Sequence, residues 1–239
     1  MEEEQDSEFV PPTPDRVCWR AFVLASITCR ASLEEAPQHP DAICTYGRLQ
    51  EWIVDEDLRQ EFEAQEWDGV IAPLGALKRR DRIDMSWRTE GLVVLAWALQ
   101  RSELPPHDRQ ADGPSVGDAI GFFEEDAVGK LIADSWQRSE DELGWLVEMT
   151  LAVHWRLRQY SLHPEPIDFV DFAEKCQWAE MPIADLPTID RDLALRGKPI
   201  CNAPESLLSE CTSIARERQQ AANWLAGYHE QYSEVTCDT

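Results

Sequence analysis

The segment from Ser86 to Gln100 constrains the fold more than any other part of the chain, because its hydrophobic residues cover nearly the whole circumference of a helix. A helix without a polar side has to be surrounded by other elements. Its longest unbroken apolar run, Leu92 to Leu99, is only eight residues, whereas a membrane-spanning helix needs roughly 20. We therefore predict a central helix in a protein core, and we expect no membrane association.

Most of the remaining chain carries the caps and apolar stripes of further helices. Thr13 and Pro14 are typical of a helix start, and Ser139 with Glu142 forms a capping box that opens a long helix. Asn202 is expected to cap the last helix. The expected helices run from about residues 14 to 36, 41 to 68, 86 to 100, 139 to 163 and 202 to 227, with further helix from 116 and from 168.

One segment has a different pattern: DLALRGKPI, from Asp192 to Ile200, alternates apolar and polar residues around Arg196-Gly197, which predicts a small β-hairpin. A chain of 239 residues with 43% hydrophobic content can bury one sizeable core, and no linker divides it. The expected fold class is mainly α, with a single multi-helix globular domain over residues 14–239. Residues 1–13 are acidic and proline-containing, so we expect a disordered tail that contributes nothing to the fold.

The charge of the chain excludes some partners. It has 46 acidic and 22 basic residues, a formal charge of −24, which repels nucleic acid and anionic lipid. The acidity has two interpretations: a solvated coat for solubility or a salty habitat, or a docking face for a basic protein partner. The N-terminus is acidic where a signal peptide would be cationic, so we expect a soluble cytoplasmic protein.

Familiar catalytic and metal-binding patterns are missing from the sequence. It contains no H-E-x-x-H, G-x-S-x-G or G-x-G-x-x-G, and its seven cysteines include no C-x-x-C pair. With 46 carboxylates some pair will always be close in space, so paired acids do not indicate hydrolysis. We therefore assign no catalytic residue, expect neither a metal nor a cofactor, and leave enzymatic activity open while favouring its absence.

Three polar residues lie on apolar helical stripes. Arg218 follows Ile214 on the stripe of the last helix, Glu90 precedes Val94 on the central helix, and His154 lies on one side of the long capped helix. A lone buried charge is costly, so each needs an opposite partner or a ligand. We expect Glu90 and Arg218 to pair. The three residues form either an internal network that fixes helix packing or a ligand site.

Several of these segments resemble a known family. The resemblance is carried by SWRTEGLVVLAWAL (Ser86–Leu99), HWRLR (His154–Arg158), DLALRGKPI (Asp192–Ile200), RERQQAANWL (Arg216–Leu225) and VTCDT (Val235–Thr239). In this order they are similar to the bacterial family described as domain of unknown function 4272 (DUF4272). Its W-R-x-E, H-W-x-x-R and E-R-H-x-A-x-N-W-L boxes match residues 87–90, 154–158 and 217–225, with Gln219 in place of the usual histidine. The resemblance implies a helical bacterial cytosolic domain and no particular activity.

Two function classes follow. The first is a protein-binding or regulatory module that binds a basic partner, in the manner of an immunity protein. The alternative is a small-ligand binder or an enzyme that uses an internal cluster in a cavity. The candidate binding cluster comprises Arg88, Glu90, His154, Arg158 and Arg218. A sealed, fully hydrogen-bonded cluster favours the first class, and a cluster that lines an open pocket favours the second; the oligomeric state stays open.

Overall fold

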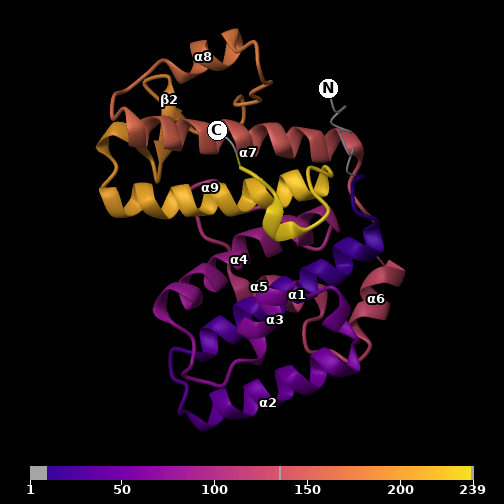
Figure 1. Ribbon diagram of the computed structural model, residues 1–239. Helices are drawn as coiled ribbons and strands as arrows, with labels where there is room; N and C mark the ends of the chain where they lie inside the picture. Colours follow the sequence, from indigo (N-terminus) through magenta and orange to yellow (C-terminus); the bar gives the residue numbers. More distant parts are fainter. Residues whose placement is uncertain (1–9, 135, 238–239) are drawn as a thin grey trace, which may run out of the picture.

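The computed structural model describes residues 10–134 and 136–237 (Figure 1). The chain is 62% helical, and mainly α with one small antiparallel sheet, as predicted. The described α-helices are α1 (Pro14–Leu33), α2 (Pro40–Asp55), α3 (Ala64–Ile71), α4 (Arg79–Ala98), α5 (Gly113–Ile120), α6 (Ala127–Asp134), α7 (Glu140–Leu162), α8 (Phe169–Lys175) and α9 (Glu205–Leu225). Short 3₁₀ turns are η1 (Leu58–Gln60), η2 (Ile200–Asn202) and η3 (Tyr232–Glu234).

The capping signals placed two helix starts correctly. At the start of α1, the Thr13 hydroxyl oxygen accepts a hydrogen bond from the Arg16 backbone N–H, and Pro14 is the first helical residue. At the start of α7, both hydrogen bonds of the Ser139–Glu142 capping box are present. Two expectations were wrong. Residues 41–68 are not one helix, because the chain turns at Asp57 (φ 53°) before α3 begins. Asn202 lies in η2, and α9 begins after Pro204.

The predicted hairpin is confirmed and extended. Strand β2 (Asp192–Leu195) pairs antiparallel with β3 (Lys198–Pro199) across Arg196 and Gly197, which both have positive φ. A third strand, β1 (Thr188–Ile189), pairs with the other edge of β2. All four residues of β2 are buried, because η2 and α8 also contact this strand. The alternating pattern of the sequence did not predict the third strand or this complete burial.

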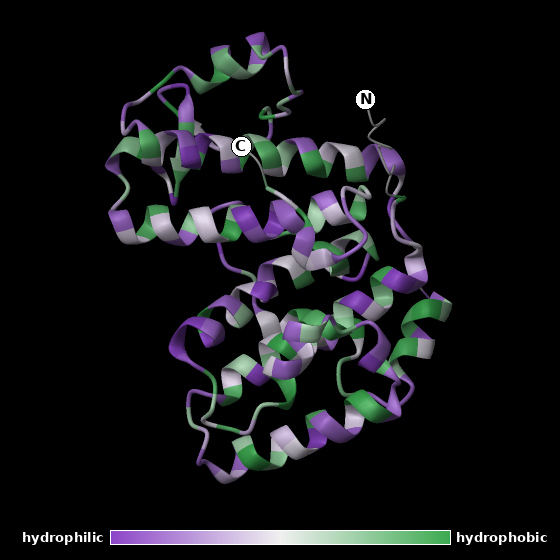
Figure 2. Ribbon diagram, in the orientation of Figure 1, coloured by the Kyte–Doolittle hydropathy of each residue, from purple (hydrophilic) through white to green (hydrophobic). Residues whose placement is uncertain are grey.

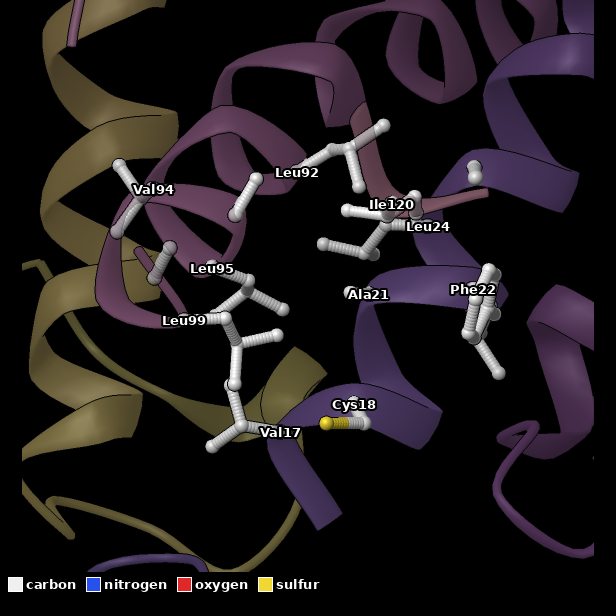
Figure 3. Close-up of a cluster of buried hydrophobic side chains, with 14 of the residues drawn as sticks. Val17, Cys18, Ala21, Phe22, Leu24, Leu92, Val94, Leu95, Leu99 and Ile120 are labelled. Carbon is white, nitrogen blue, oxygen red and sulfur yellow. The ribbon is translucent and has the colours of Figure 1, made fainter. Parts of the chain in front are cut away.

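The helices enclose two hydrophobic clusters. One is centred on α1 and α4, and Figure 3 shows Val17 and Ala21 of α1 facing Leu95 of α4. The other lies between α7, the first half of α9 and β2. In Figure 1, α7 and α9 run side by side, with β2 and α8 at one end of them and helices α1 to α6 below. Only the C-terminal half of α4, Glu90–Ala98, is buried throughout, so the central helix is buried over half its length.

Outer helices are amphipathic, and Figure 2 shows hydrophobic and hydrophilic residues alternating along them. None of the described helices combines the length and hydropathy that a membrane crossing requires. Residues 1–9 of the expected tail lie outside the described residues. The next residues are packed: Pro12 is buried, and the backbone of Val10 and Pro11 lies directly on Gly227, after the end of α9.

This contact generates a stability prediction. Gly227 has φ +80°, and an added Cβ would be 2.6 Å from the Pro11 nitrogen, so Gly227→Ala meets both backbone strain and a collision. We expect it to lower the free energy of unfolding by at least about 1–2 kcal/mol. Gly144→Ala is the matched control, because Gly144 lies within α7 with open space around it and should gain about 0.5–1 kcal/mol. Urea unfolding measures both, and equal stabilities would contradict the prediction.

Candidate functional site

The predicted pair between Glu90 of α4 and Arg218 of α9 is confirmed. The Arg218 Nε and Nη2 atoms lie 2.9 and 2.8 Å from Glu90 Oε2. Glu90 is 1% exposed and Arg218 is 5% exposed, so both charges are removed from water. Such burial is tolerated only when the pair has further hydrogen bonds.

The segment 105–111 supplies those hydrogen bonds. Arg218 Nη1 donates to the carbonyl oxygens of Pro105 (2.9 Å) and Pro106 (3.1 Å), and Nη2 also donates to that of Arg109 (2.7 Å). The second Glu90 oxygen accepts from the Ala111 backbone N–H at 2.8 Å. All three guanidinium nitrogens of Arg218 thus donate hydrogen bonds within the chain, and Nη2 is also in the ion pair with Glu90. The pair is therefore an internal contact in which every charged nitrogen and oxygen has a partner.

Arg88 of α4 joins the same interface closer to solvent, with its side chain 22% exposed. Its Nη1 donates to Glu217 Oε2 (2.9 Å) and to the Gln220 side chain (3.0 Å), and its guanidinium lies over the Tyr232 ring. Burial is the largest single influence and lowers the pKa of Arg88, but Glu217, Tyr232 and Glu66 together outweigh it, so the pKa is raised. Arg88 thus links α4, α9 and η3 as a charged structural contact.

His154 makes a separate contact. Its Nδ1 lies 2.5 Å from the side-chain oxygen of Gln219, so it pairs α7 with α9 on another side of α9. Burial lowers the pKa of His154, which favours the neutral ring with its proton on Nδ1 donated to the amide oxygen. Gln219, which departs from the family box, is therefore the partner of the histidine rather than a base.

Arg158 does not join the cluster, because its side chain is exposed on α7. The buried arginine of the HWRLR segment is Arg156, which is 0% exposed and donates to both Asp192 carboxylate oxygens at 2.7 and 2.6 Å. Asp192 also accepts the Ile167 and Leu193 backbone N–H groups. Sequence reasoning missed this pair, although Arg156 lies on the buried stripe of Ala152 and Val153 and Asp192 opens the hairpin.

The five predicted residues thus lie at three separate places: two interhelical contacts and one exposed position. Arg88, Glu90 and Arg218 meet at the α4–α9 interface, His154 meets Gln219 at the α7–α9 interface, and Arg158 faces solvent. The proposed single cluster is therefore divided. Among the described residues, no group of three or more His, Cys, Asp or Glu side chains is arranged to hold a metal ion.

Two grooves include residues of these contacts in their walls, and a third hollow has none of them in its lining. A groove of about 640 Å³ between α1, α4 and α5 includes Glu90 in its wall. A groove of about 350 Å³ between α7 and α9, roofed by residues 104–107, includes Arg218 and His107. His107 is buried and was not singled out by the sequence. A third hollow of about 510 Å³, between α2 and residues 123–126, is bordered mainly by carboxylates.

The pairing generates a double-mutant prediction. Glu90→Ala and Arg218→Ala should each lower the free energy of unfolding by roughly 3–5 kcal/mol, because each leaves a buried charge unpaired. The double variant should lose less than the sum of the two. The control is the exposed pair Arg80–Asp84 in the same helix (3.6 Å), whose alanine variants should change stability little. Additive losses at Glu90 and Arg218, measured by urea unfolding, would exclude the coupling.

The comparisons with known proteins agree with the resemblance of the sequence. The family model described as a domain of unknown function (DUF4272) matches residues 2–171, which is well over half of the chain. The match contains the segments 86–99 and 154–158, whereas the other three resembling segments lie beyond it. No curated protein and no solved structure matches the chain. On the family model, the chain belongs to the DUF4272 family.

Proposed function

We propose that this protein is a bacterial, cytoplasmic binding or regulatory module that recognises a basic protein partner. The observation that carries the proposal is the distribution of its arginines. The four arginines that are buried each contact a carboxylate of the same chain: Arg20 with Glu66, Arg30 with Glu34, Arg156 with Asp192 and Arg218 with Glu90. Because each pair is formally neutral, the excess of 24 negative charges belongs to the rest of the molecule.

The internal contacts favour this class over an enzyme built on Glu90, His154 and Arg218. Every guanidinium nitrogen of Arg218 donates a hydrogen bond, both Glu90 oxygens accept one, and His154 is hydrogen-bonded to Gln219. Groups that are fully engaged in the folded chain have no free donor or charge for a substrate. These residues therefore support the packing of helices rather than chemistry on a ligand.

The acidic hollow between α2 and residues 123–126 is the docking face that we favour. Glu56 is structural, since its two oxygens accept the Ala127 and Val128 backbone N–H groups at the start of α6. Glu51, Asp55 and Glu125 are exposed around it. The two sides of the hollow are joined by a hydrogen bond from Trp52 Nε1 of α2 to the Glu124 carbonyl oxygen, at 2.9 Å.

A basic partner would place lysine or arginine side chains in this hollow. The cation already there, Arg48, is held by the hollow itself, because it donates to the Phe123 carbonyl oxygen (3.1 Å) and lies over the Phe123 ring. Long-range attraction to the negative surface would speed the encounter, and screening by salt would weaken it. An immunity protein neutralises a basic toxin in this way, by covering its cationic surface.

The test uses a fluorescent decalysine peptide and measures its dissociation constant by anisotropy at low and at physiological salt. The variant Glu51→Gln/Asp55→Asn/Glu125→Gln should weaken binding by about tenfold, since three exposed contacts are lost. The variant Glu174→Gln/Glu180→Gln/Asp190→Asn is the control, because it removes the same charge from exposed positions elsewhere. Equal weakening by both variants would mean that net charge alone attracts the peptide and that the hollow is not a docking face.

A further inference from the structure

The groove between α7 and α9 has the properties of a small-molecule site. Its volume of about 350 Å³ falls within the range of about 300–1,000 Å³ that such sites occupy. The residues around it are mostly apolar, and they include the partly exposed Trp145. The apolar side chains of its lining include Leu104, Trp145, Met149, Val153, Leu186 and Ile214.

The one guanidinium in this groove cannot bind an anion. Arg218 borders the groove, but its three guanidinium nitrogens already contact Glu90 and three backbone carbonyl oxygens. Its role there is to hold the roof, because two of those carbonyl groups belong to Pro105 and Pro106. An anionic ligand would therefore meet no free donor from Arg218 and would be repelled by Asp185, which also borders the groove.

His107 supplies a free acceptor instead. The side chain is 7% exposed, and its Nε2 lies 2.9 Å from the Ala194 carbonyl oxygen. Because a carbonyl oxygen can only accept, Nε2 carries the proton. Burial lowers the pKa of His107, which favours the neutral ring and leaves a lone pair on Nδ1. No described protein group donates to this Nδ1 atom, and it is not among the sealed polar atoms of the described residues, so its lone pair is open to an incoming donor.

Thr150 has the same polarity. Its hydroxyl hydrogen is directed to backbone carbonyl oxygens one turn earlier in α7, at 2.8 Å from Leu146 and 3.0 Å from Val147. Its oxygen can then only accept from a ligand. A ligand that matches His107 and Thr150 therefore carries a hydrogen-bond donor, and a ligand that matches the apolar side chains has an apolar body.

We propose that this groove binds a neutral apolar small molecule with one hydrogen-bond donor, such as a phenol or an alcohol, and that the donor hydrogen binds to His107 Nδ1. The site is held in place before binding: Arg218 fixes the roof, and the Ala194 carbonyl group fixes the histidine ring. A preformed site of this kind avoids the cost of ordering its loops on binding. This inference is independent of the basic partner, whose face lies at α2.

Three probes of one shape test the inference on the full chain: 2-naphthol, 2-methoxynaphthalene and 2-naphthoate. Binding is followed by NMR, from the backbone amide shifts of Thr150, Val153 and Ala215. We expect 2-naphthol to bind tightest, 2-methoxynaphthalene about tenfold more weakly because its donor is blocked, and 2-naphthoate weakest of all. The inference is overturned if the methyl ether binds as tightly as the naphthol, if the carboxylate binds tightest, or if no probe shifts these amides.

Two variants locate the effect. His107→Phe keeps an aromatic ring and removes the acceptor at Nδ1, together with the donor to the Ala194 carbonyl group, so 2-naphthol and 2-methoxynaphthalene should then bind equally. Met149→Trp fills the groove and should abolish binding of every probe, whereas Ile83→Trp, at an exposed position of α4, should leave it unchanged. Unchanged binding in Met149→Trp would place the probes elsewhere and refute the site. If His107→Phe does not fold, the order of the three probes on the unchanged chain decides alone.

Discussion

The ion pair between Glu90 and Arg218 joins the two hydrophobic clusters of the molecule. Glu90 begins the buried half of α4, which belongs to the cluster around α1. On α9, Ala215 belongs to the cluster with α7 and Ala221 to the cluster with α4, so Arg218 lies where one cluster gives way to the other. A buried pair alone does not guarantee stability, but its geometry is directional and fixes how two helices cross.

The same pair determines where the segment after α4 lies. Segment 105–111 has no regular structure, and its backbone carbonyl groups would be unsatisfied if they were simply buried. Arg218 donates hydrogen bonds to three of these carbonyl groups, and Glu90 accepts a hydrogen bond from one backbone N–H of the segment. Once the segment is anchored, His107 reaches Ala194 in β2, and Asp108 accepts the Arg196 backbone N–H in the hairpin turn. The groove and the position of the hairpin therefore depend on the pair.

The sequence predicts those parts of the structure whose causes are local. Caps and stripes placed α1 and α7, and two opposite charges on apolar stripes predicted the Glu90–Arg218 pair. It did not predict that Arg218 and Gln219 serve different neighbours, because successive helical residues point about 100° apart and their neighbours are set by tertiary packing. His107 escaped prediction for another reason: its partner is a backbone carbonyl group 87 residues away, which leaves no pattern in the side chains.

The two proposals have one physical origin, which is that two buried arginines, Arg218 and Arg156, direct the donors of all their guanidinium nitrogens to the same chain. The donors of Arg218 and Arg156 end on carboxylates, a glutamine side chain and backbone carbonyl groups of the same chain. What remains for other molecules is therefore rich in acceptors: carboxylates around the α2 hollow, and His107 Nδ1 with the Thr150 oxygen in the groove. Exposed basic residues, such as the run Lys78 to Arg80 at the start of α4 and Arg158 on α7, are exceptions. A molecule that binds at either site has to supply the hydrogens, as lysine side chains would at one and a hydroxyl group at the other.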